Sequence, residues 1–410
     1  MSFTRKNADL TPIVDTVFVV ADAARKDKKE NPDLVKNATL GSLYDEEGNL
    51  VAFDSVFNHY DEIAHKVKAK YASSFTGNPN YREEIYKWFI QDIDLDLAHS
   101  TIATPGGTGA VSLTLKSILD TNETLIVPNI AWGSYNLMAS ENKYNLISYE
   151  MFEGDHFNLS SLKKCIEEVK ETQEKIVIII NDPCHNPTGY SLTIQEWEEL
   201  VSYLNEVSKN NPCIIINDVA YIDYSYDLAN SRNYLNTWNS FSENILSVVA
   251  FSLSKTMTSY GMRCGAAIVL AKKQEDVRDV EILMEKGARA TWSNINNSAM
   301  ENFVWVAKEN KENYLKEKDT YIKLLRERST IFMEEAKECG LDIYPYKEGF
   351  FLTVKMNNNE DRDRLHEALI NKHIYTVKVN LGIRVAICSL SIEATKGLAK
   401  LIKDTMMEIL

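Results

Sequence analysis

The sequence predicts an α/β protein in which a three-layer αβα domain with a mainly parallel sheet is joined to a small α+β domain. Its 410 residues, 44% of them hydrophobic, suffice for one large and one small domain. From about residue 81 to residue 270, short β-rich apolar runs alternate with helix-like runs, as buried strands joined by crossover helices do. Beyond about residue 285, long charged helices precede short strands, which is typical of an α+β lobe.

The clearest single unit is a βαβ crossover. The run KIVIII (175–180) is an expected strand, TIQEWEELVSYLNEV (193–207) an expected helix and CIIIND (213–218) the next strand. A long charged helix is expected over residues 310–339. Further strands are expected at ILSVVAF (245–251), GAAIVL (265–270), GFFLTVKM (349–356) and IRVAICSL (383–390).

The N-terminal stretch AARKDKKENPDLVKN (23–37) is charged and contains a proline, which favours an arm and linker without regular structure. Regular structure is expected to start later in the chain. We therefore predict an arm and part of the small domain over residues 1–50, the large domain over 51–305 and the small domain over 306–410.

Composition excludes several classes of partner. With 45 basic and 59 acidic residues the net charge is -14, which repels nucleic acid and anionic membrane surfaces. No apolar stretch approaches the roughly 18 residues of a membrane span, and the N-terminus lacks the pattern of a signal peptide. The six cysteines are scattered, which indicates reduced thiols and neither a disulfide framework nor a metal site. These features predict a soluble, cytoplasmic protein.

A glycine-rich turn is the first of four segments at predicted strand ends, where open α/β sheets bind ligands. In ATPGGTGA (103–110), the glycines let backbone N–H groups approach an anion at the start of a helix. Gly107 is one of these glycines, and the Thr108 hydroxyl adds a hydrogen-bond donor. The segment is neither a Walker loop nor GxGxxG, so an ordinary turn fits it about as well.

Two polar segments follow the strands of the βαβ unit. In NDPCHNPTGYSLT (181–193), Asn186 precedes a proline and lies on a rigid turn, where a capping role is the alternative. In INDVAYIDY (216–224), Asp218 ends an apolar strand and Tyr221 comes three residues later. A carboxylate at this position can hold a proton on a heterocyclic nitrogen by ion pairing, although a surface loop would also accept it.

The fourth segment, FSLSKTMTSYGMRCGAA (251–267), places Lys255 between an apolar strand and a glycine-containing loop. A desolvated lysine has a lowered pKa and forms an imine with an aldehyde. Ser252, Ser254 and Arg263 supply donors for a phosphate. The four segments together provide partners for a phosphate, a pyridine nitrogen, a phenolic oxygen and an aldehyde. Pyridoxal phosphate is the cofactor that has all four groups.

The motifs HNPTG (185–189), DVAY (218–221) and SLSK (252–255) with a trailing GMRCG resemble, in this order, the class I aminotransferases of the aspartate and aromatic branch. The resemblance runs over most of the chain. It implies the fold of the type I pyridoxal-phosphate-dependent transferases and a homodimer whose active sites are each built from both chains. It also implies pyridoxal phosphate as the cofactor.

By this resemblance, Lys255 holds the cofactor as a Schiff base and later moves a proton at the substrate Cα. Asp218 keeps the pyridine nitrogen protonated, Tyr221 and Asn186 bind the phenolic oxygen, and Trp132 in PNIAWGSY stacks on the ring. The residues implied to hold the phosphate are Gly107, Thr108, Ser252, Ser254 and Arg263.

The resemblance also assigns three residues to substrate and partner contacts. Arg384 in GIRVAICSL matches the arginine that binds the substrate α-carboxylate. Arg289 in RATWSN matches an arginine that binds a dicarboxylate's distal group across the dimer interface. Tyr71 in KYASSFTGNPNYR matches a tyrosine that reaches the phosphate of the neighbouring subunit.

The sequence departs from the family's pattern in three places. Gly106 stands where aspartate enzymes commonly carry a phosphate-binding serine, and Ile295 and Asn296 replace two prolines. The spacing from Tyr71 to Gly77 is one residue longer than usual. The Gly106 and proline departures bear on the substrate more than on the cofactor.

The implied reaction moves the amino group of an L-amino acid, aspartate or aromatic, to a 2-oxo acid, with 2-oxoglutarate expected, by a ping-pong mechanism. Two alternatives stay open. One is a lyase, decarboxylase or synthase that uses the same cofactor, because the fold does not fix the reaction. The other is a binding protein with a vestigial aminotransferase domain.

Overall fold

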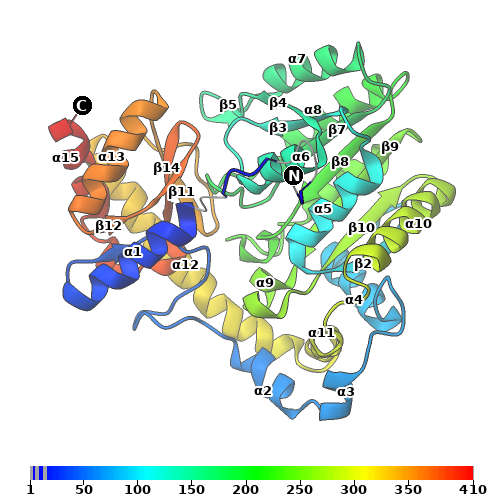
Figure 1. Cartoon of the computed structure of the whole chain (residues 1–410), viewed down its shortest axis with the longest axis horizontal. Coiled ribbons are helices and arrows are strands. Elements are labelled where there is room, and N and C mark those ends of the chain that lie inside the picture. The colour runs from blue at the N-terminus through cyan, green and yellow to red at the C-terminus, as the bar shows by residue number, and fades with distance from the viewer. Residues whose placement is uncertain (1–2, 5–8, 13–15, 410) are drawn as a thin grey trace.

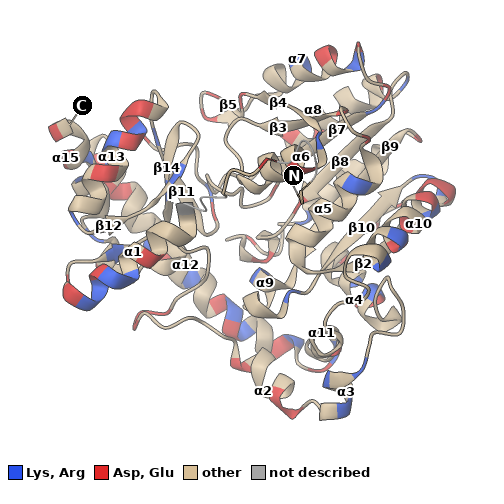
Figure 2. Ribbon diagram, viewed as in Figure 1, with Lys and Arg blue, Asp and Glu red and all other residues tan. Residues whose placement is uncertain are grey.

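The computed structural model describes residues 3–4, 9–12 and 16–409, and it shows two lobes side by side (Figure 1). The large lobe is built on a seven-stranded sheet and the small lobe on a three-stranded antiparallel sheet. Charged side chains lie mainly on the outer helices, and the central strands carry few of them (Figure 2). None of the described helices is both long enough and apolar enough to cross a membrane.

The large sheet is mainly parallel, as predicted. Its strands, in spatial order, are β2 (Ala98–Thr104), β10 (Gly265–Ala271), β9 (Ile245–Ser252), β8 (Cys213–Asp218), β7 (Ile176–Asn181), β3 (Thr124–Pro128) and β4 (Asn145–Tyr149). Only β10 runs antiparallel, and it pairs with β2 and β9. The connection from β9 to β10 spans 253–264 and includes the one-turn helix α9 (Leu253–Thr256). This helix is too short to cover the sheet as the helix of a parallel crossover does.

Both faces of this sheet are buried, which explains the unbroken apolar runs in the sequence. Along β7, Ile178 and Ile180 face one hydrophobic cluster, whereas Val177 and Ile179 face another. One face is covered by α5 (Gly106–Ile118), α6 (Ser134–Asn142) and α10 (Gln274–Thr291). The other face is covered by α4 (Pro79–Ile90), α7 (Leu159–Lys170), α8 (Ile194–Val207) and α11 (Asn297–Glu309). The strands expected at 175–180, 213–218, 245–251 and 265–270 and the helix at 193–207 are therefore confirmed to within a residue or two, whereas the strand expected at 383–390 ends already at Ala386.

The large lobe also contains shorter elements that complete its surface. These are α2 (Asp54–Glu62), α3 (His65–Ala69), the hairpin of β5 (Phe152–Glu153) and β6 (His156–Phe157), and three 3-10 helices at Ile222–Tyr224, Asn233–Ser240 and Tyr260–Met262.

The small lobe packs helices against a short antiparallel sheet, as the sequence predicts. The sheet order is β11 (Phe351–Lys355), β14 (Gly382–Ala386) and β13 (Val377–Val379). The covering helices are α13 (Asn359–Asn371), α14 (Ile392–Thr395) and α15 (Leu398–Ile409), and a 3-10 helix spans Ile387–Ser389. The predicted charged helix is α12 (Lys311–Cys339).

Helix α12 contributes to both lobes. Tyr314 and Leu325 belong to the large-lobe cluster, whereas Phe332 and Ala336 belong to the small-lobe cluster. The transition between the lobes therefore falls within this helix. The domain boundary near residue 306 stays a prediction.

The prediction of an arm and linker without regular structure at residues 23–37 was wrong. Helix α1 (Thr16–Glu30) forms here, and β1 (Lys36–Asn37) pairs with β12 (Ile374–Tyr375). Val20 and Ala24, four residues apart, form a narrow apolar stripe that packs on Tyr375. The stripe consists of only these two residues beside a charged stretch, so the sequence pattern did not indicate a helix.

A tight turn at Gly189 docks the loop after β7 onto the small lobe. The Gly189 carbonyl accepts hydrogen bonds from the backbone N–H groups of Lys347 (2.9 Å) and Glu348 (3.0 Å). Gly189 has φ +71°, and a Cβ there would lie 2.5 Å from the Phe351 carbonyl oxygen and would overlap the Tyr346 ring. Only glycine fits this junction.

We predict that Gly189→Ala destabilises the protein far more than Gly154→Ala. Gly154 also has a positive φ (+61°), but a Cβ there meets nothing within 4 Å. Gly154→Ala should therefore lower the free energy of unfolding by about 1 kcal/mol, because alanine is strained in the left-handed backbone conformation. Gly189→Ala adds steric overlap and should cost about 3 kcal/mol or more in urea unfolding. Equal losses in the two variants would contradict this account of the junction.

Candidate active site

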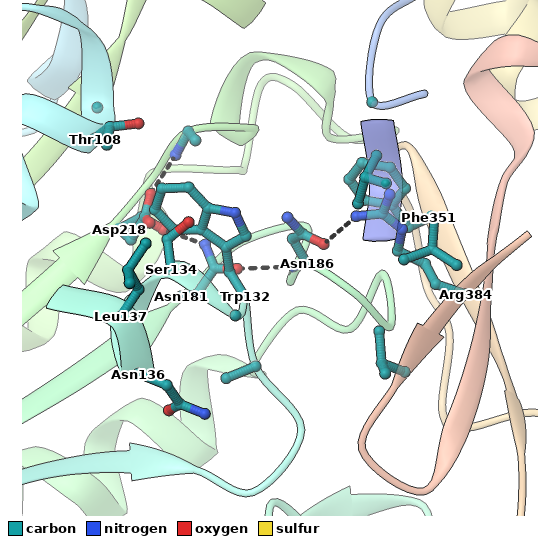
Figure 3. Close-up of a pocket in the computed structure, with 18 of the residues that line it drawn as sticks. Thr108, Trp132, Ser134, Asn136, Leu137, Asn181, Asn186, Asp218, Phe351 and Arg384 are labelled. Atoms are coloured by element: carbon teal, nitrogen blue, oxygen red, sulfur yellow. Dashed lines mark hydrogen bonds between the residues drawn. The ribbon is translucent and has the colours of Figure 1, made fainter. Parts of the chain in front are cut away.

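A cavity of about 1120 Å³ is lined by residues of both lobes. Several large-lobe residues of its wall come from strand ends, with Asp218 ending β8 and Ser252 ending β9. Strand β14 of the small lobe contributes Arg384 to the same cavity (Figure 3). The sequence-predicted residues in the lining are Gly107, Thr108, Trp132, Asn186, Asp218, Tyr221, Ser252, Ser254, Lys255, Arg263 and Arg384.

The amine of Lys255 projects from the one-turn helix α9 that follows β9. Its Nζ donates a hydrogen bond to the Gly41 carbonyl oxygen at 2.5 Å. The amine also lies over the rings of Tyr260, 4.8 Å from the centroid, and Tyr221, 5.5 Å from the centroid. Burial lowers the pKa of Lys255 to about 8, and Arg384 adds to this effect. About a tenth of this amine is therefore neutral, and nucleophilic, at pH 7.

The carboxylate of Asp218 is buried at the cavity wall and contacts neutral donors. The Tyr135 hydroxyl donates to Oδ2 at 2.7 Å, and the Ala220 backbone N–H donates to Oδ1 at 3.2 Å. Burial raises the pKa of Asp218, and the hydrogen bond from Tyr135 opposes the rise. Among the described residues no basic side chain forms an ion pair with this carboxylate. No basic side chain among the described residues therefore neutralises the charge of the buried Asp218 carboxylate.

A chain of hydrogen bonds crosses the cavity from Asp218 to the small lobe (Figure 3). Asn181 donates to the Asp218 carbonyl oxygen at 2.7 Å and accepts from the Asn186 backbone N–H at 2.7 Å. Arg384 Nη1 then donates to the Asn186 side-chain oxygen at 3.2 Å, and its Nη2 donates to the Thr39 carbonyl at 2.9 Å. The Arg384 guanidinium therefore meets the large lobe at Asn186.

The glycine-rich turn and Arg263 lie against each other at one end of the cavity. A Cβ at Gly106, which has φ +75°, would lie 2.8 Å from Arg263 Nη2. A Cβ at Gly107 would lie 3.2 Å from Ser252 Cβ. Arg263 Nη1 donates to Ser254 Oγ at 3.1 Å. Backbone N–H groups of the first turn of α5, a guanidinium and two hydroxyls thus gather here, and this combination of donors binds anions.

Two predicted residues lie outside this cavity. Tyr71 is 81% exposed. Arg289 is also exposed, with its guanidinium 4.7 Å from the Phe75 ring centroid and Nη1 donating to Ser293 Oγ at 2.5 Å. A single chain therefore does not bring either side chain into its own site.

At residues 295 and 296, where the family has two prolines, a helix cap is present instead. Asn296 is the N-cap of α11, and its side-chain oxygen accepts from the Ala299 backbone N–H at 3.2 Å and from Ser298 Oγ at 2.8 Å. This cap fixes the start of the helix by hydrogen bonds.

Several residues that line the cavity or contact its lining were missed by sequence reasoning. Tyr135 follows Trp132 by three residues, and its ring meets the Trp132 ring edge-on at 5.4 Å between centroids. Asn181 lies at the start of a segment of which only Asn186 was singled out. Gly41 contacts Lys255 across 214 residues of chain, whereas Tyr260 lies only five residues after Lys255. Nothing in the sequence pointed to Gly41, whereas the other three residues lie within or beside segments that the sequence analysis singled out.

The sequence of this chain matches a known protein family. A sequence model of the family described as aminotransferase class I and II matches residues 41–402. Aspartate aminotransferase of Escherichia coli (strain K12) is 24% identical over 285 residues, which cover 68% of this chain and 69% of the relative.

Two solved structures show the same architecture. An aminotransferase from Anaerococcus prevotii dsm 20548 has a TM-score of 0.94 and 32% identity, and the match covers 100% of both chains. An aromatic-amino-acid aminotransferase from Burkholderia pseudomallei, covalently bound to pyridoxal phosphate, has a TM-score of 0.80 and 18% identity, and the match covers 99% of this chain and 100% of that one. These similarities confirm the predicted fold class.

We predict that Lys255 reacts with a small aromatic aldehyde with a pH midpoint near 8, the value to which burial lowers its pKa. Only the neutral amine attacks a carbonyl, so the rate should rise as pH increases through this midpoint. Trapping with a mild hydride donor followed by peptide mass spectrometry measures the adduct, and Lys255→Arg should yield none at this position. A midpoint close to the ordinary lysine pKa of about 10.4 would contradict the burial of this amine.

Proposed function

This chain belongs to the family of class I and II aminotransferases, and from that premise we propose that it moves the amino group of an L-amino acid to 2-oxoglutarate in two half-reactions. Family membership makes it a transaminase that depends on pyridoxal phosphate. The observation that carries the proposed reaction is the cavity that Lys255, Asp218 and Arg384 line together.

The residues present fit this cofactor. A carboxylate that is buried without a described cation suits a protonated ring nitrogen, and the turn at Gly107, which has no Cβ, leaves space for a phosphate beside Ser252. The lining residues that would hold the phosphate are Gly107, Thr108, Ser252, Ser254 and Arg263. When bound, the cofactor supplies an electron sink for the electron pair left on the substrate Cα.

Lys255 both carries the cofactor and moves the proton in this proposal. Its amine is partly neutral near pH 7 because burial lowers its pKa to about 8. Lys255 Nζ would hold the cofactor and, when free as an amine, would move the proton between the substrate Cα and the carbon on the other side of the amino nitrogen. The Gly41 carbonyl, 2.5 Å away, holds the released amine within the site.

Three further groups orient the ring. Asp218 holds the proton on the ring nitrogen, and Tyr135 aims that carboxylate through a hydrogen bond of 2.7 Å. Tyr221 and Asn186 bind the phenolic oxygen, and Trp132 covers one face of the ring. Burial raises the pKa of Tyr221, so its hydroxyl stays protonated and can donate.

Arg384 binds the substrate α-carboxylate. Its guanidinium carbon lies 4.3 Å from the Phe351 ring centroid, and a guanidinium can bind a carboxylate through two N–H groups. Asn186, already bonded to Arg384, bridges this group to the cofactor side. Aspartate and aromatic amino acids are the two proposed donors, since the relatives include an aspartate and an aromatic-amino-acid aminotransferase.

We propose a homodimer in which Arg289 and Tyr71 act in the partner's site. Both side chains are exposed and lie outside the cavity of their own chain. Arg289 would bind a distal carboxylate, of aspartate or of glutamate and 2-oxoglutarate, and Tyr71 would reach the phosphate.

The predicted outcome of an activity test is stoichiometric glutamate from aspartate or tyrosine plus 2-oxoglutarate. Each donor should also convert the aldehyde form of the bound cofactor to the amine form without an acceptor, as followed by absorbance. Lys255→Ala should lower turnover by about 10³-fold or more, because it removes both the covalent attachment and the base. Pyruvate or carbon dioxide without glutamate would indicate a lyase or decarboxylase, and a cofactor that no amino acid converts would indicate a binding protein.

Hybrid dimers test whether Arg289 acts across the interface. A Lys255→Ala chain mixed with an Arg289→Ala chain should regain about a quarter of wild-type activity on aspartate, because half of the dimers are hybrid and each hybrid has one complete site. Neither parent dimer should reach this level. If Arg289 served its own chain, the hybrid would have no complete site and mixing would restore nothing.

A further inference from the structure

A buried charge cluster lies beneath helix α9, outside the cavity. Asp223 (3% exposed) forms an ion pair with Arg232 (1% exposed), and Lys318 (1% exposed) approaches from α12. Lys318 Nζ lies over the rings of Tyr224 and Tyr314, 4.8 and 4.7 Å from their centroids, and it makes no hydrogen bond with a described residue. None of these three charged residues lines the cavity.

The charges of the cluster are compensated internally. Burial alone would raise the pKa of Asp223, but Arg232 and Lys318 outweigh it and hold that pKa below its ordinary value. Burial lowers the pKa of Lys318 to about 7, and Asp223 opposes this shift. The Asp223 carboxylate therefore stays ionised in the folded protein and can act as a strong acceptor.

The cluster holds the backbone that carries Lys255. Thr256 Oγ1 donates to Asp223 Oδ2 at 2.7 Å, and Trp88 Nε1 donates to the same oxygen at 3.0 Å. The Tyr314 hydroxyl donates to the Thr256 carbonyl at 2.6 Å, and the Tyr224 hydroxyl donates to the Lys255 carbonyl at 3.1 Å. Residues 255 and 256 are thus fixed from the side opposite the cavity.

Such external bonds matter because α9 is only four residues long. A helix of one turn leaves nearly all its terminal N–H and C=O groups unpaired, so its own bonds cannot set its orientation. A displacement of about 1 Å at a reacting group can cost about 10²-fold in rate. The contacts beneath α9 therefore determine where the Lys255 side chain leaves the helix.

We propose that Asp223 is a positioning residue for Lys255, acting through the Thr256 hydroxyl, with Arg232 and Lys318 balancing its charge. This inference rests on the proposed aminotransferase reaction. It assigns to helix α12 a part in holding the reacting lysine, in addition to its packing in both lobes.

The test replaces Thr256 and compares two substitutions. Thr256→Val keeps the shape of the side chain and removes the donor, and it should lower kcat and the single-turnover rate of cofactor conversion by about tenfold. The KM for the amino donor should stay within about twofold, because Arg384 is untouched. Thr256→Ser keeps the hydroxyl and should restore both rates to near wild type.

Two controls separate positioning from loss of stability. Thr405→Val removes a comparable buried hydroxyl bond, 2.7 Å to the Leu401 carbonyl in α15, and should leave both rates unchanged. Thr256→Ala cannot overpack the site and should show the same fall in rate as Thr256→Val. Wild-type rates in Thr256→Val, or an equal fall in Thr405→Val, would overturn the inference. A wild-type enzyme without any amino transfer would instead refute the proposed function.

Discussion

The structure depends on a half-buried amine and a buried carboxylate that line one cavity without forming an ion pair with each other. Lys255 is satisfied by a carbonyl and two aromatic rings, and Asp218 by a hydroxyl and a backbone N–H. Shielding two charged groups from water without pairing them is unfavourable unless a ligand interacts with both. A cofactor with an aldehyde and a basic ring nitrogen would complete both groups.

Two rigid supports maintain this separation. The parallel strands β8 and β9 end side by side, so Asp218 and the segment leading to Lys255 start from neighbouring points on one sheet. Arg384 comes from the other lobe, and its bond to the Asn186 side chain ties the lobes together across the cavity. The spacing of the three charged groups is therefore set by strand pairing and lobe contact, and flexible loops contribute less.

The sequence predicted the parts of the site that follow apolar strands. Asp218 and Lys255 were identifiable because strands buried on both faces are unbroken apolar runs, and a charged residue at their end is conspicuous. Long-range contacts were not predictable, since Gly41 meets Lys255 across 214 residues of chain. The antiparallel direction of β10 depends on a short connection, and helix α1 depends on a stripe of only two apolar residues. Both are decided by tertiary packing, which local patterns do not record.

The departures from the family's pattern have local structural causes. Gly106 has a positive φ and the Arg263 guanidinium occupies the place of its missing Cβ, so a serine would not fit with this arginine conformation. Asn296 replaces a proline at a helix start, and its side chain caps that helix. Neither change requires a different substrate to explain it. In the proposed homodimer, the exposed Arg289 would reach the partner's site, and the choice between aspartate and aromatic donors would depend on where the dimer places that guanidinium.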